Sequence, residues 1–554
     1  MRNKWVLWCI LLLLPLGALA QLSGGATADS ILGHQKQFDA DGKLLPWYNP
    51  HVPGAGYVEV ARLASGFVKN APVYEPLGLK MYYVSCCFQG PRTSENGEFV
   101  AEAWMHNPAC IWAGMVQSLV VDYRVFSGDD SYIEVVREML DYQLEHGTTP
   151  PDWAWASVPY ASADPFKTEY HGAEKWQNDG MRGDGLHGIE PDKVGELGVN
   201  YLKFYQVTEE KRFLEAAIHC ADALAKNVRD VRPENKDFVL AETSRSPWPF
   251  RVQAETNEVS SEYCSNVVEP IRLFEELVRN ADRLGITPEE VGSYKKARQI
   301  AWEWLYSING PMKTYIWNAY FEDIPNDPDQ TNRVQITPME TARHLVKHPE
   351  LDPDLDNTVP ALIHWVASAF GTDGMDAIKE QTWCYLPMGS HTSRYASLCA
   401  LWYEHTGEEW YRDQAERFFN FATYMCFDDG VVAVGHNWPG SWWSDGYGDY
   451  IRHFMEGLAA IPEWAPAGEN HLLKSSSVVQ SVKYNNKNVR YRTWDDHADE
   501  VLRLASKPVT VTVNGKQIEQ TETPVGEGWT WRQLDNGGVL KISHESGHDI
   551  EITL

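Results

Sequence analysis

Apolar residues recur at helical spacing through most of the chain before residue 465. Within 213–224, Phe213, Ala217, Ala221 and Leu224 lie three or four positions apart, so they share one face of a helix. The stretches 111–126, 194–206 and 393–405 are also rich in apolar residues and predict helices. This part of the chain is therefore predicted to be mainly helical.

A loose repeat follows each of these apolar-rich helices. It consists of a turn, acidic residues suited to a helix N-terminus, an aromatic residue, and a small or apolar residue four positions on. Clear copies occupy 128–136, 208–217 and 407–415, and a weaker copy occupies 288–297. Helix pairs repeated at irregular intervals over such a length predict a helical toroid or solenoid.

The pattern changes to short strands after residue 465. The segments 477–484, 488–492, 508–513 and 539–542 alternate β-branched with polar residues, and Asn514-Gly515 and Asn536-Gly537-Gly538 are hairpin signals. We therefore expect a helical domain over 21–465 and a small C-terminal β-sandwich over 466–554. The sandwich could bind glycan, but we favour a structural cap on the helical domain.

The N-terminal residues have the pattern of a secretory signal peptide. Arg2 and Lys4 precede an apolar run over 5–14, and Ala18-Leu19-Ala20 matches the site that signal peptidase accepts. The run is too short to span a bilayer, and no second run of spanning length follows. The expectation is cleavage after Ala20 and a periplasmic or secreted protein without a membrane span.

Composition narrows the range of partners. The formal net charge of −29 argues against nucleic acid, because phosphate binding needs clustered Lys and Arg. The nine cysteines form no paired C-x-x-C motifs, so zinc is not expected, and nothing indicates another metal or a cofactor. The 23 tryptophans suit a protein that stacks on sugar rings, although tryptophan is also a core residue.

Taken together, the helix pairs, the leader and the aromatic content resemble the (α/α)6-toroid glycoside hydrolases and polysaccharide lyases. The resemblance covers roughly residues 30–465. Within that group the chain looks most like exported enzymes directed at uronic acids, such as the β-glucuronidases of glycoside hydrolase family 154. The resemblance implies an oligosaccharide or polysaccharide substrate, bound in a cleft formed by the loops that join inner and outer helices.

Three long polar loops are candidates for lining that cleft, and the first runs over 169–190. Its glycines disfavour regular structure, and it crowds together acidic, histidine and arginine side chains. Glycoside hydrolysis needs one carboxylic acid and one carboxylate. The candidate catalytic residues are Asp179, Asp184, Glu190 and His187, with Tyr170, His171 and Arg182 binding substrate. A solvated acidic loop or a calcium loop is the alternative, although the calcium-loop spacing is missing.

The second loop, 383–395, leads into a helix. His391, Arg394 and Tyr395 are expected to project near one another from its first turn. The planar guanidinium of Arg394 suits the carboxylate of a uronate, and His391 and Tyr395 are candidate proton carriers. The alternative is an ordinary capped helix start with a buried histidine.

Aromatic residues stand among glycines in the third loop, 435–450. We expect substrate contacts from five of them: His436, Trp438, Trp442, Trp443 and Tyr447. Asp445 and Asp449 lie four positions apart and could share a helix face, where placement favourable to the helix dipole is the simpler explanation.

These loops leave three functions open. Carboxylates in the first loop favour a glycoside hydrolase that cleaves a uronic-acid glycan. His171, Tyr170, His391, Arg394 and Tyr395 would also suit a lyase that cleaves a uronate glycan by β-elimination. The tryptophans of the third loop and the β-sandwich would suit a non-catalytic glycan-binding protein. The hydrolase is the leading hypothesis.

Overall fold

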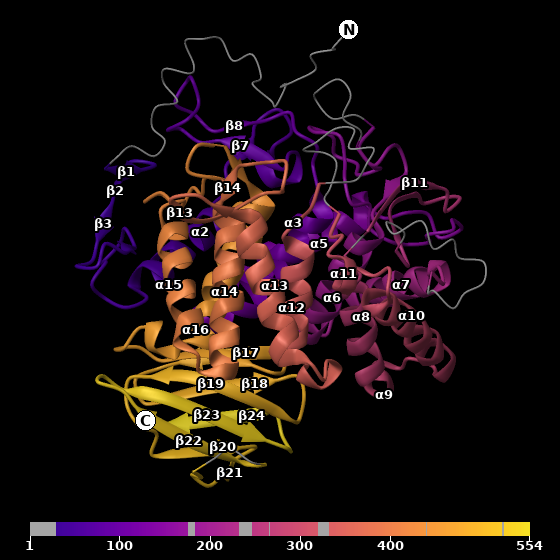
Figure 1. Ribbon diagram of the computed structural model, residues 1–554. Coiled ribbons are helices and arrows are strands. Elements are labelled where there is room, and N and C mark those ends of the chain that lie inside the picture. Colours follow the sequence, from indigo (N-terminus) through magenta and orange to yellow (C-terminus); the bar gives the residue numbers. More distant parts are fainter. Residues whose placement is uncertain are drawn as a thin grey trace.

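The computed structural model describes residues 29–174, 183–231, 246–264, 266–318, 332–438, 440–522 and 526–554. The predicted signal peptide, Asp179 and Arg182 lie outside these residues. Figure 1 shows a body of helices with a domain of strands at one end. No helix within the described ranges combines the length and apolar character needed to cross a membrane.

A ring of inner helices forms the centre of the helical body. These helices are buried on nearly all sides: in the fifth of them, every residue from Gly389 to Trp402 is buried. A helix that is buried all round belongs in a core. Along the described chain the inner helices are α3 (Pro108–Met115) with its continuations η3 (Val116–Tyr123) and α4 (Arg124–Ser127), α6 (Pro191–Thr208), α8 (Val268–Arg279), α12 (Ile336–Lys347), α14 (Gly389–Thr406), and η5 (Ser444–Asp449) continuing into α16 (Tyr450–Ala460).

Outer helices alternate with the inner ones along the chain. They are amphipathic: Phe213, Ala217, Ala221 and Leu224 of α7 are buried, as their spacing predicts. The outer set is α2 (Ala55–Lys69), α5 (Ser131–His146), α7 (Lys211–Asn227), α10 (Pro288–Tyr306), α13 (Leu355–Phe370) and α15 (Glu409–Thr423), with the short α9 (Ala281–Leu284) and α11 (Pro311–Thr314) between them.

Contacts between neighbours close the inner helices into a ring. Each packs against the next, and α16 contacts both α14 and η3, which joins the last inner helix to the first. Two of the turns from an inner to an outer helix use a left-handed glycine, Gly128 (φ 75°) and Gly407 (φ 74°), as expected for helix C-caps. The predicted (α/α)6 toroid is confirmed.

Short strands cover the end of the ring at which the inner helices begin (Figure 1). Most belong to three small antiparallel sheets and the rest to three two-stranded pairs. The sheets combine β7 (Cys87–Gln89), β8 (Val100–Ala101) and β15 (Ser441–Trp442); β9 (Gly188–Ile189), β10 (Pro249–Gln253) and β11 (Val259–Cys264); and β12 (Gly371–Thr372), β13 (Met375–Lys379) and β14 (Pro387–Met388). The pairs combine β1 (Ser30–Ile31) with β2 (His34–Gln35), β3 (Gln37–Phe38) with β4 (Leu44–Leu45), and β5 (Val73–Tyr74) with β6 (Leu79–Lys80).

The C-terminal domain is a β-sandwich with its own apolar core. One sheet has the order β16-β19-β23-β22 and the other β17-β18-β24-β20-β21. Asn514-Gly515 turns β20 into β21, as its hairpin signal predicts. The strands are β16 (His471–Ser475), β17 (Val479–Tyr484), β18 (Asn488–Thr493), β19 (Ala498–Leu504), β20 (Thr510–Val513), β21 (Lys516–Gln517), β22 (Gly528–Gln533), β23 (Gly538–His544) and β24 (Asp549–Thr553).

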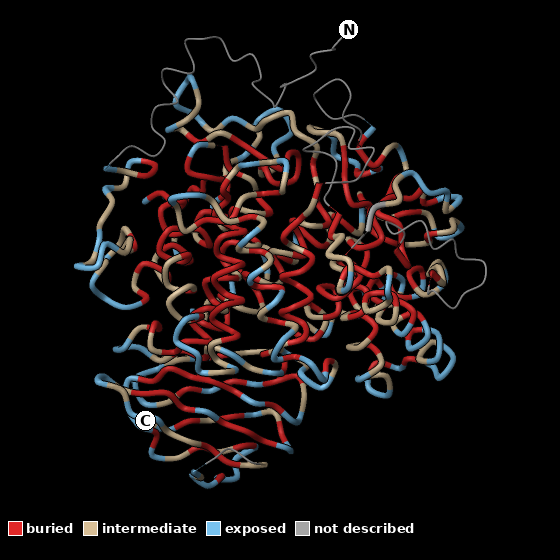
Figure 2. Tube along the Cα trace, viewed as in Figure 1, coloured by how far each residue is buried: buried red, intermediate tan, exposed pale blue. Residues whose placement is uncertain are grey.

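This sandwich packs on the end of the ring at which the inner helices finish. Strands β16 and β17 contact α4, and they also touch α16 and α6, respectively. The Arg124 side chain is fully buried and donates to the carbonyl of Val479, and Tyr484 donates to the carbonyl of Val125 at 2.5 Å. Figure 2 shows the buried residues continuing from the ring towards the sandwich. The sandwich therefore caps one end of the toroid.

Candidate active site

A pocket of about 160 Å³ lies where the inner helices begin. Each of the six inner helices lines it with a residue at or near its N-terminus, and backbone N–H groups at such ends carry partial positive charge. These residues are Cys110 of α3, Lys193 of α6, Glu269 of α8, Glu340 of α12, His391 of α14 and Asp445 of η5. The fold thus concentrates helix N-termini around one small volume.

Charged side chains dominate the lining of this pocket. Trp104 and Trp442, whose ring centres are 5.7 Å apart, supply aromatic surface beside them. Lys193, Arg394, Arg452 and His391 supply positive or titratable nitrogen. The carboxyl groups are those of Glu190, Glu196, Glu269, Glu340, Glu380, Asp445 and Asp449. So many carboxyl groups in one cavity cannot share one environment, and their partners decide which are ionised.

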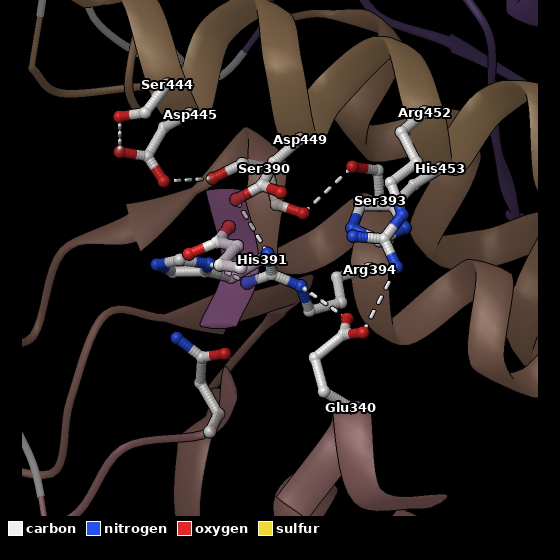
Figure 3. Close-up of polar contacts among 12 residues, drawn as sticks. Glu340, Ser390, His391, Ser393, Arg394, Ser444, Asp445, Asp449, Arg452 and His453 are labelled. Atoms are coloured by element: carbon white, nitrogen blue, oxygen red, sulfur yellow. Dashed lines mark hydrogen bonds and ion pairs between the residues drawn. The ribbon is translucent and has the colours of Figure 1, made fainter. Parts of the chain in front are cut away.

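Glu340 and Arg394 form the ionised floor of the pocket (Figure 3). Arg394 Nη2 lies 2.6 Å from Asp449 Oδ2, and its Nε lies 3.3 Å from Glu340 Oε1. Burial alone would raise the pKa of Glu340, but the surrounding arginines hold that pKa well below its ordinary value. Besides Arg394, Glu340 meets Arg272, Arg343 and Arg452 at 3.1–3.3 Å. This carboxylate holds the floor together and stays charged.

Asp445 has a different environment at the same pocket. Its two oxygens lie 3.2 Å from the hydroxyl groups of Ser390 and Ser444. No ion pair to it occurs among the described residues. Burial, reinforced by Glu380 and Asp449 against the opposing effect of His391 and Arg394, raises the pKa of Asp445 to about 6. Near neutral pH this carboxyl group can therefore carry a proton and give it up.

His391 pairs with Glu380 beside Asp445. Its Nε2 lies 2.5 Å from Glu380 Oε2, and Arg394 Nη1 lies 3.4 Å from its Nδ1. Because a guanidinium can only donate, Nδ1 is the acceptor, and the Nε2 proton points at Glu380. Glu380 follows directly after β13, so the small β12-β13-β14 sheet positions it over the start of α14.

Glu190 and Glu196 line the α6 side of the pocket. Arg251 lies 3.0 Å from Glu190 through Nη2 and also pairs with Asp184. Burial and the nearby Asp184 raise the pKa of Glu190 well above its ordinary value, despite Arg251. Burial also raises the pKa of Glu196 to about 7, although Lys193 Nζ lies only 2.8 Å away. These shifts in pKa favour the protonated form of both carboxyl groups.

Four of the residues selected from the sequence line this pocket: Glu190, His391, Arg394 and Trp442. Asp184 is not among the lining residues, because it is buried behind Glu190, where it pairs with Arg251 and accepts a hydrogen bond from Ser162. Asp184 therefore contacts Arg251 and Ser162 and does not face the pocket.

The structure places the other described candidates away from the lining. Tyr395 is fully buried with its ring 4.6 Å from that of Phe418, because it projects from the outer side of α14. Trp443 and Tyr447 pack on Phe67 in the core. Of the rest, Tyr170 donates to the carbonyl of Tyr83 at 2.8 Å, His436 is buried, Trp438 and His187 are half-buried, and His171 is exposed.

Most of the charged residues that line the pocket were not among the candidates chosen from the sequence. Some lie outside the three polar loops, and others lie within those loops but were not chosen. Glu196, Glu269 and Glu340 lie inside helices, in or just after the first turn. The usable signal was a carboxyl group near the start of four of the six inner helices, α6, α8, α12 and η5, and using it requires the inner helices to be told from the outer ones. Asp445 and Asp449 stood four apart in the third loop, and their shared helix face does line the pocket.

No protein-family model matches the chain, and no curated protein matches it. Similar solved structures include cellobiose 2-epimerases from Spirochaeta thermophila (10% identical, 73% of this chain and 97% of that one, TM-score 0.48) and Bacillus thermoamylovorans (11%, 72% and 98%, 0.47). An unsaturated glucuronyl hydrolase specific for heparin is 9% identical over 73% of this chain and 96% of that one, with a TM-score of 0.42. Likeness at this distance does not transfer an activity, so the pocket is interpreted from its own residues.

Proposed function

We propose that the chain is a glycoside hydrolase in which Asp445 is the general acid. The observation that carries this proposal is a half-buried carboxyl group, held by two hydroxyl groups, whose pKa is raised to about 6 at a pocket lined by two tryptophans. Cleavage of a glycosidic bond requires a carboxylic acid that protonates the leaving oxygen. An acid with a pKa near the working pH suits that step.

The partner group in this proposal is Glu380 with His391. Among the pocket carboxyl groups, Glu380 lies close enough to Asp445 to raise its pKa, and it is held 2.5 Å from a histidine. Glu380 is the proposed base for the proton of the attacking water, through Oε1, the carboxyl oxygen that does not contact His391. Glu190, which also lines the pocket and holds a proton, is the second candidate acid.

An acidic sugar is the substrate class that we propose. Six helix N-termini surround the pocket, and helix N-termini favour negative charge. Lys193 and Arg452 add cationic side chains to the lining. With Asp445, Glu190 and Glu196 protonated, the pocket's own negative charge is reduced, which lowers the cost of admitting a uronate carboxylate. Trp104 and Trp442 can stack on the sugar ring.

A polysaccharide lyase is the second candidate, because His391 and Arg394 do meet at the pocket. Arg394, however, is already matched by Asp449 and Glu340, so its guanidinium has less capacity left for a substrate carboxylate. No tyrosine lines the pocket within the described ranges. These two observations favour hydrolysis over β-elimination.

Replacing Asp445 by asparagine tests the proposed general acid. Asp445→Asn keeps the shape but cannot protonate the leaving oxygen, so we expect kcat to fall by about 100-fold or more with KM little changed. The measurement is the release of free sugar from oligosaccharides and the release of the aglycone from aryl glycosides. Asp356→Asn, an exposed aspartate at the start of α13, is the matched control and should retain full activity.

Two comparisons separate the parts of the proposal. An aryl β-glucuronide should be cleaved faster than the matching aryl β-glucoside. The reverse order would contradict the proposed acidic substrate but not the proposed hydrolase activity. A product that absorbs in the ultraviolet as an unsaturated uronate would establish the lyase instead. Undiminished activity in Asp445→Asn would remove Asp445 from the mechanism.

A further inference from the structure

A second cluster of polar side chains lies further along two of the inner helices. Glu275 of α8 meets His344 of α12 and His348, the residue that ends α12. One potential ligand atom from each residue lies within 4.8 Å of the other two. Glu275 is six residues beyond the pocket residue Glu269 on the same helix, a distance of about 9 Å at the rise of an α-helix. The cluster is therefore separate from the pocket.

The spacing of the donor atoms fits a transition-metal ion. His344 Nε2 lies 3.3 Å from Glu275 Oε2. Two ligands that bind Zn²⁺ tetrahedrally at about 2.0–2.1 Å are themselves about 3.3–3.4 Å apart. His344 and His348 are one helical turn apart with ring centres separated by 4.7 Å, the arrangement by which two histidines on one helix face share an ion. One edge of the coordination polyhedron is thus already in place.

The nitrogen at the centre of this cluster, Nε2 of His344, lacks a hydrogen-bond partner among the described residues. His344 is only 2% exposed, and its Nε2 makes no hydrogen bond to any residue in the described part of the chain, because the approach of Glu275 has the distance but not the geometry of one. A buried polar atom without a partner needs an explanation, and a bound metal ion is one of the recognised explanations. Here the nitrogen lies between two other potential ligands.

Neighbouring side chains orient the ligands. Arg298 donates to Oε1 of Glu275 from Nε at 2.8 Å and from Nη2 at 2.6 Å. Both bonds reach the same oxygen, so Oε2 stays available on the histidine side. His348 Nδ1 lies 3.5 Å from Glu350, a carboxylate that can orient the imidazole ring. Carboxylates in this outer position raise the basicity of a ligating histidine.

We propose that Glu275, His344 and His348 bind a divalent transition-metal ion of the Zn²⁺ class and so join α8 to α12. Two imidazoles and one carboxylate are a common donor set for such ions and leave one position for water. The ion would strengthen the contact between the neighbouring inner helices α8 and α12. At the pocket end, the ion pair of Arg272 with Glu340 already joins these two helices. Its role is structural, at a distance from the chemistry of the pocket.

Zinc binding by the full chain, after treatment with chelator, tests this proposal. Titration calorimetry with Zn²⁺ should show a site that His348→Ala weakens at least tenfold and that His219→Ala leaves unchanged. His348 is partly exposed, so its loss is tolerated, and His219 is an exposed histidine of α7 outside the cluster. Glu275→Gln should weaken the same site.

A second readout is thermal stability. Added Zn²⁺ should raise the Tm of the unaltered chain and of His219→Ala but not that of His348→Ala, because an ion that binds the folded state stabilises it. The proposal is overturned if the unaltered chain binds no Zn²⁺, or if His348→Ala binds it as tightly as His219→Ala does. The Asp445→Asn variant should still bind Zn²⁺ at this site, and this result would distinguish the site from any zinc bound at the pocket.

Discussion

Asp445 and Glu340 show how neighbouring side chains divide the carboxyl groups of one pocket into acids and anions. Glu340 is buried and Asp445 is half-buried, and removal from water raises the pKa of each. Arginines in direct contact override this effect at Glu340, whereas among the residues that the structure describes only hydroxyl groups lie within hydrogen-bonding distance of Asp445. Groups whose environments move their pKa values apart are suited to different roles in acid–base chemistry. The carboxyl groups of the pocket therefore already differ in pKa before any substrate enters.

The raised pKa of Asp445 predicts a pH-dependent cost to stability. The folded chain holds this proton up to about pH 6, whereas an unfolded aspartate releases it near 3.9, so the folded state loses relative stability as pH rises between these values. We expect Asp445→Asn to melt at a higher temperature than the unaltered chain at about pH 8 and at nearly the same temperature at about pH 4, where both carry a neutral group. Thermal melts at the two pH values check this, with Asp356→Asn as control, and an equal difference at both would contradict it.

Of the candidate residues chosen from the sequence, the structure places some in the lining of the pocket and others away from it. His391 and Arg394 stand in the first turns of an inner helix and reach the pocket. Tyr395, one position further, is turned into the core, because successive helix residues point about 100° apart. The sequence shows which residues are close in the chain, but the rotation of the helix within the ring decides which of them face the centre.

At the scale of elements, close packing between inner helices depends on glycine. Gly114 of α3 and Gly448 of η5 face each other so closely that a methyl group on Gly448 would lie 3.0 Å from Gly114 Cα. The helix over Ser444–Asp449 is also widened into a π-helical segment, a form often found at functional sites. This crossing sets where Asp445 and Asp449 stand. Helical periodicity predicted the helices themselves, but neither the widened segment nor the crossing has a signal in that periodicity.

A pair of substitutions within η5 tests the importance of this crossing. Gly448→Ala must push the two helices apart, and we expect a loss of about 1–3 kcal/mol in the free energy of unfolding together with reduced activity. Gly446→Ala meets only ordinary contacts at 3.4 Å or more and costs little, so it controls for helix propensity in the same segment. Denaturant unfolding and kcat/KM provide the measurements. Equal effects of the two substitutions would show that the close approach is not what matters.

At the scale of the molecule, the toroid and the sandwich are joined through buried polar contacts as well as apolar ones. Arg124, on the inner helix, donates to carbonyl groups of β17, and His471 of β16 stacks on Phe126 with ring centres 4.0 Å apart. Val125 of the ring belongs to the apolar core of the sandwich. The change from helical to alternating pattern in the sequence predicted two parts, but nothing in it indicated which end of the ring the second part covers.

Removing the Arg124 guanidinium should weaken this junction. Arg124→Leu leaves carbonyl groups of Val479 and Gln480 without their donor, and we expect a loss of about 2–4 kcal/mol. In calorimetry the melting transition should fall and separate into two. Arg490→Leu, an exposed arginine of β18 paired with Glu551, is the control and should change little. A single transition at the original temperature in Arg124→Leu would contradict the role of this contact.

The capped end of the ring has a consequence for how a polymer would be processed. In the proposed hydrolase, the sandwich covers the ends of α4, α6 and α16, so we expect a glycan to enter the pocket from the side on which the short sheets lie. A passage with a single mouth admits a chain terminus and cannot let a strand thread through. Digestion should then shorten chains from one end and lower the viscosity of a polymer solution slowly relative to the sugar released. The freed unit must also leave by the entrance, so it competes with the next terminus to enter.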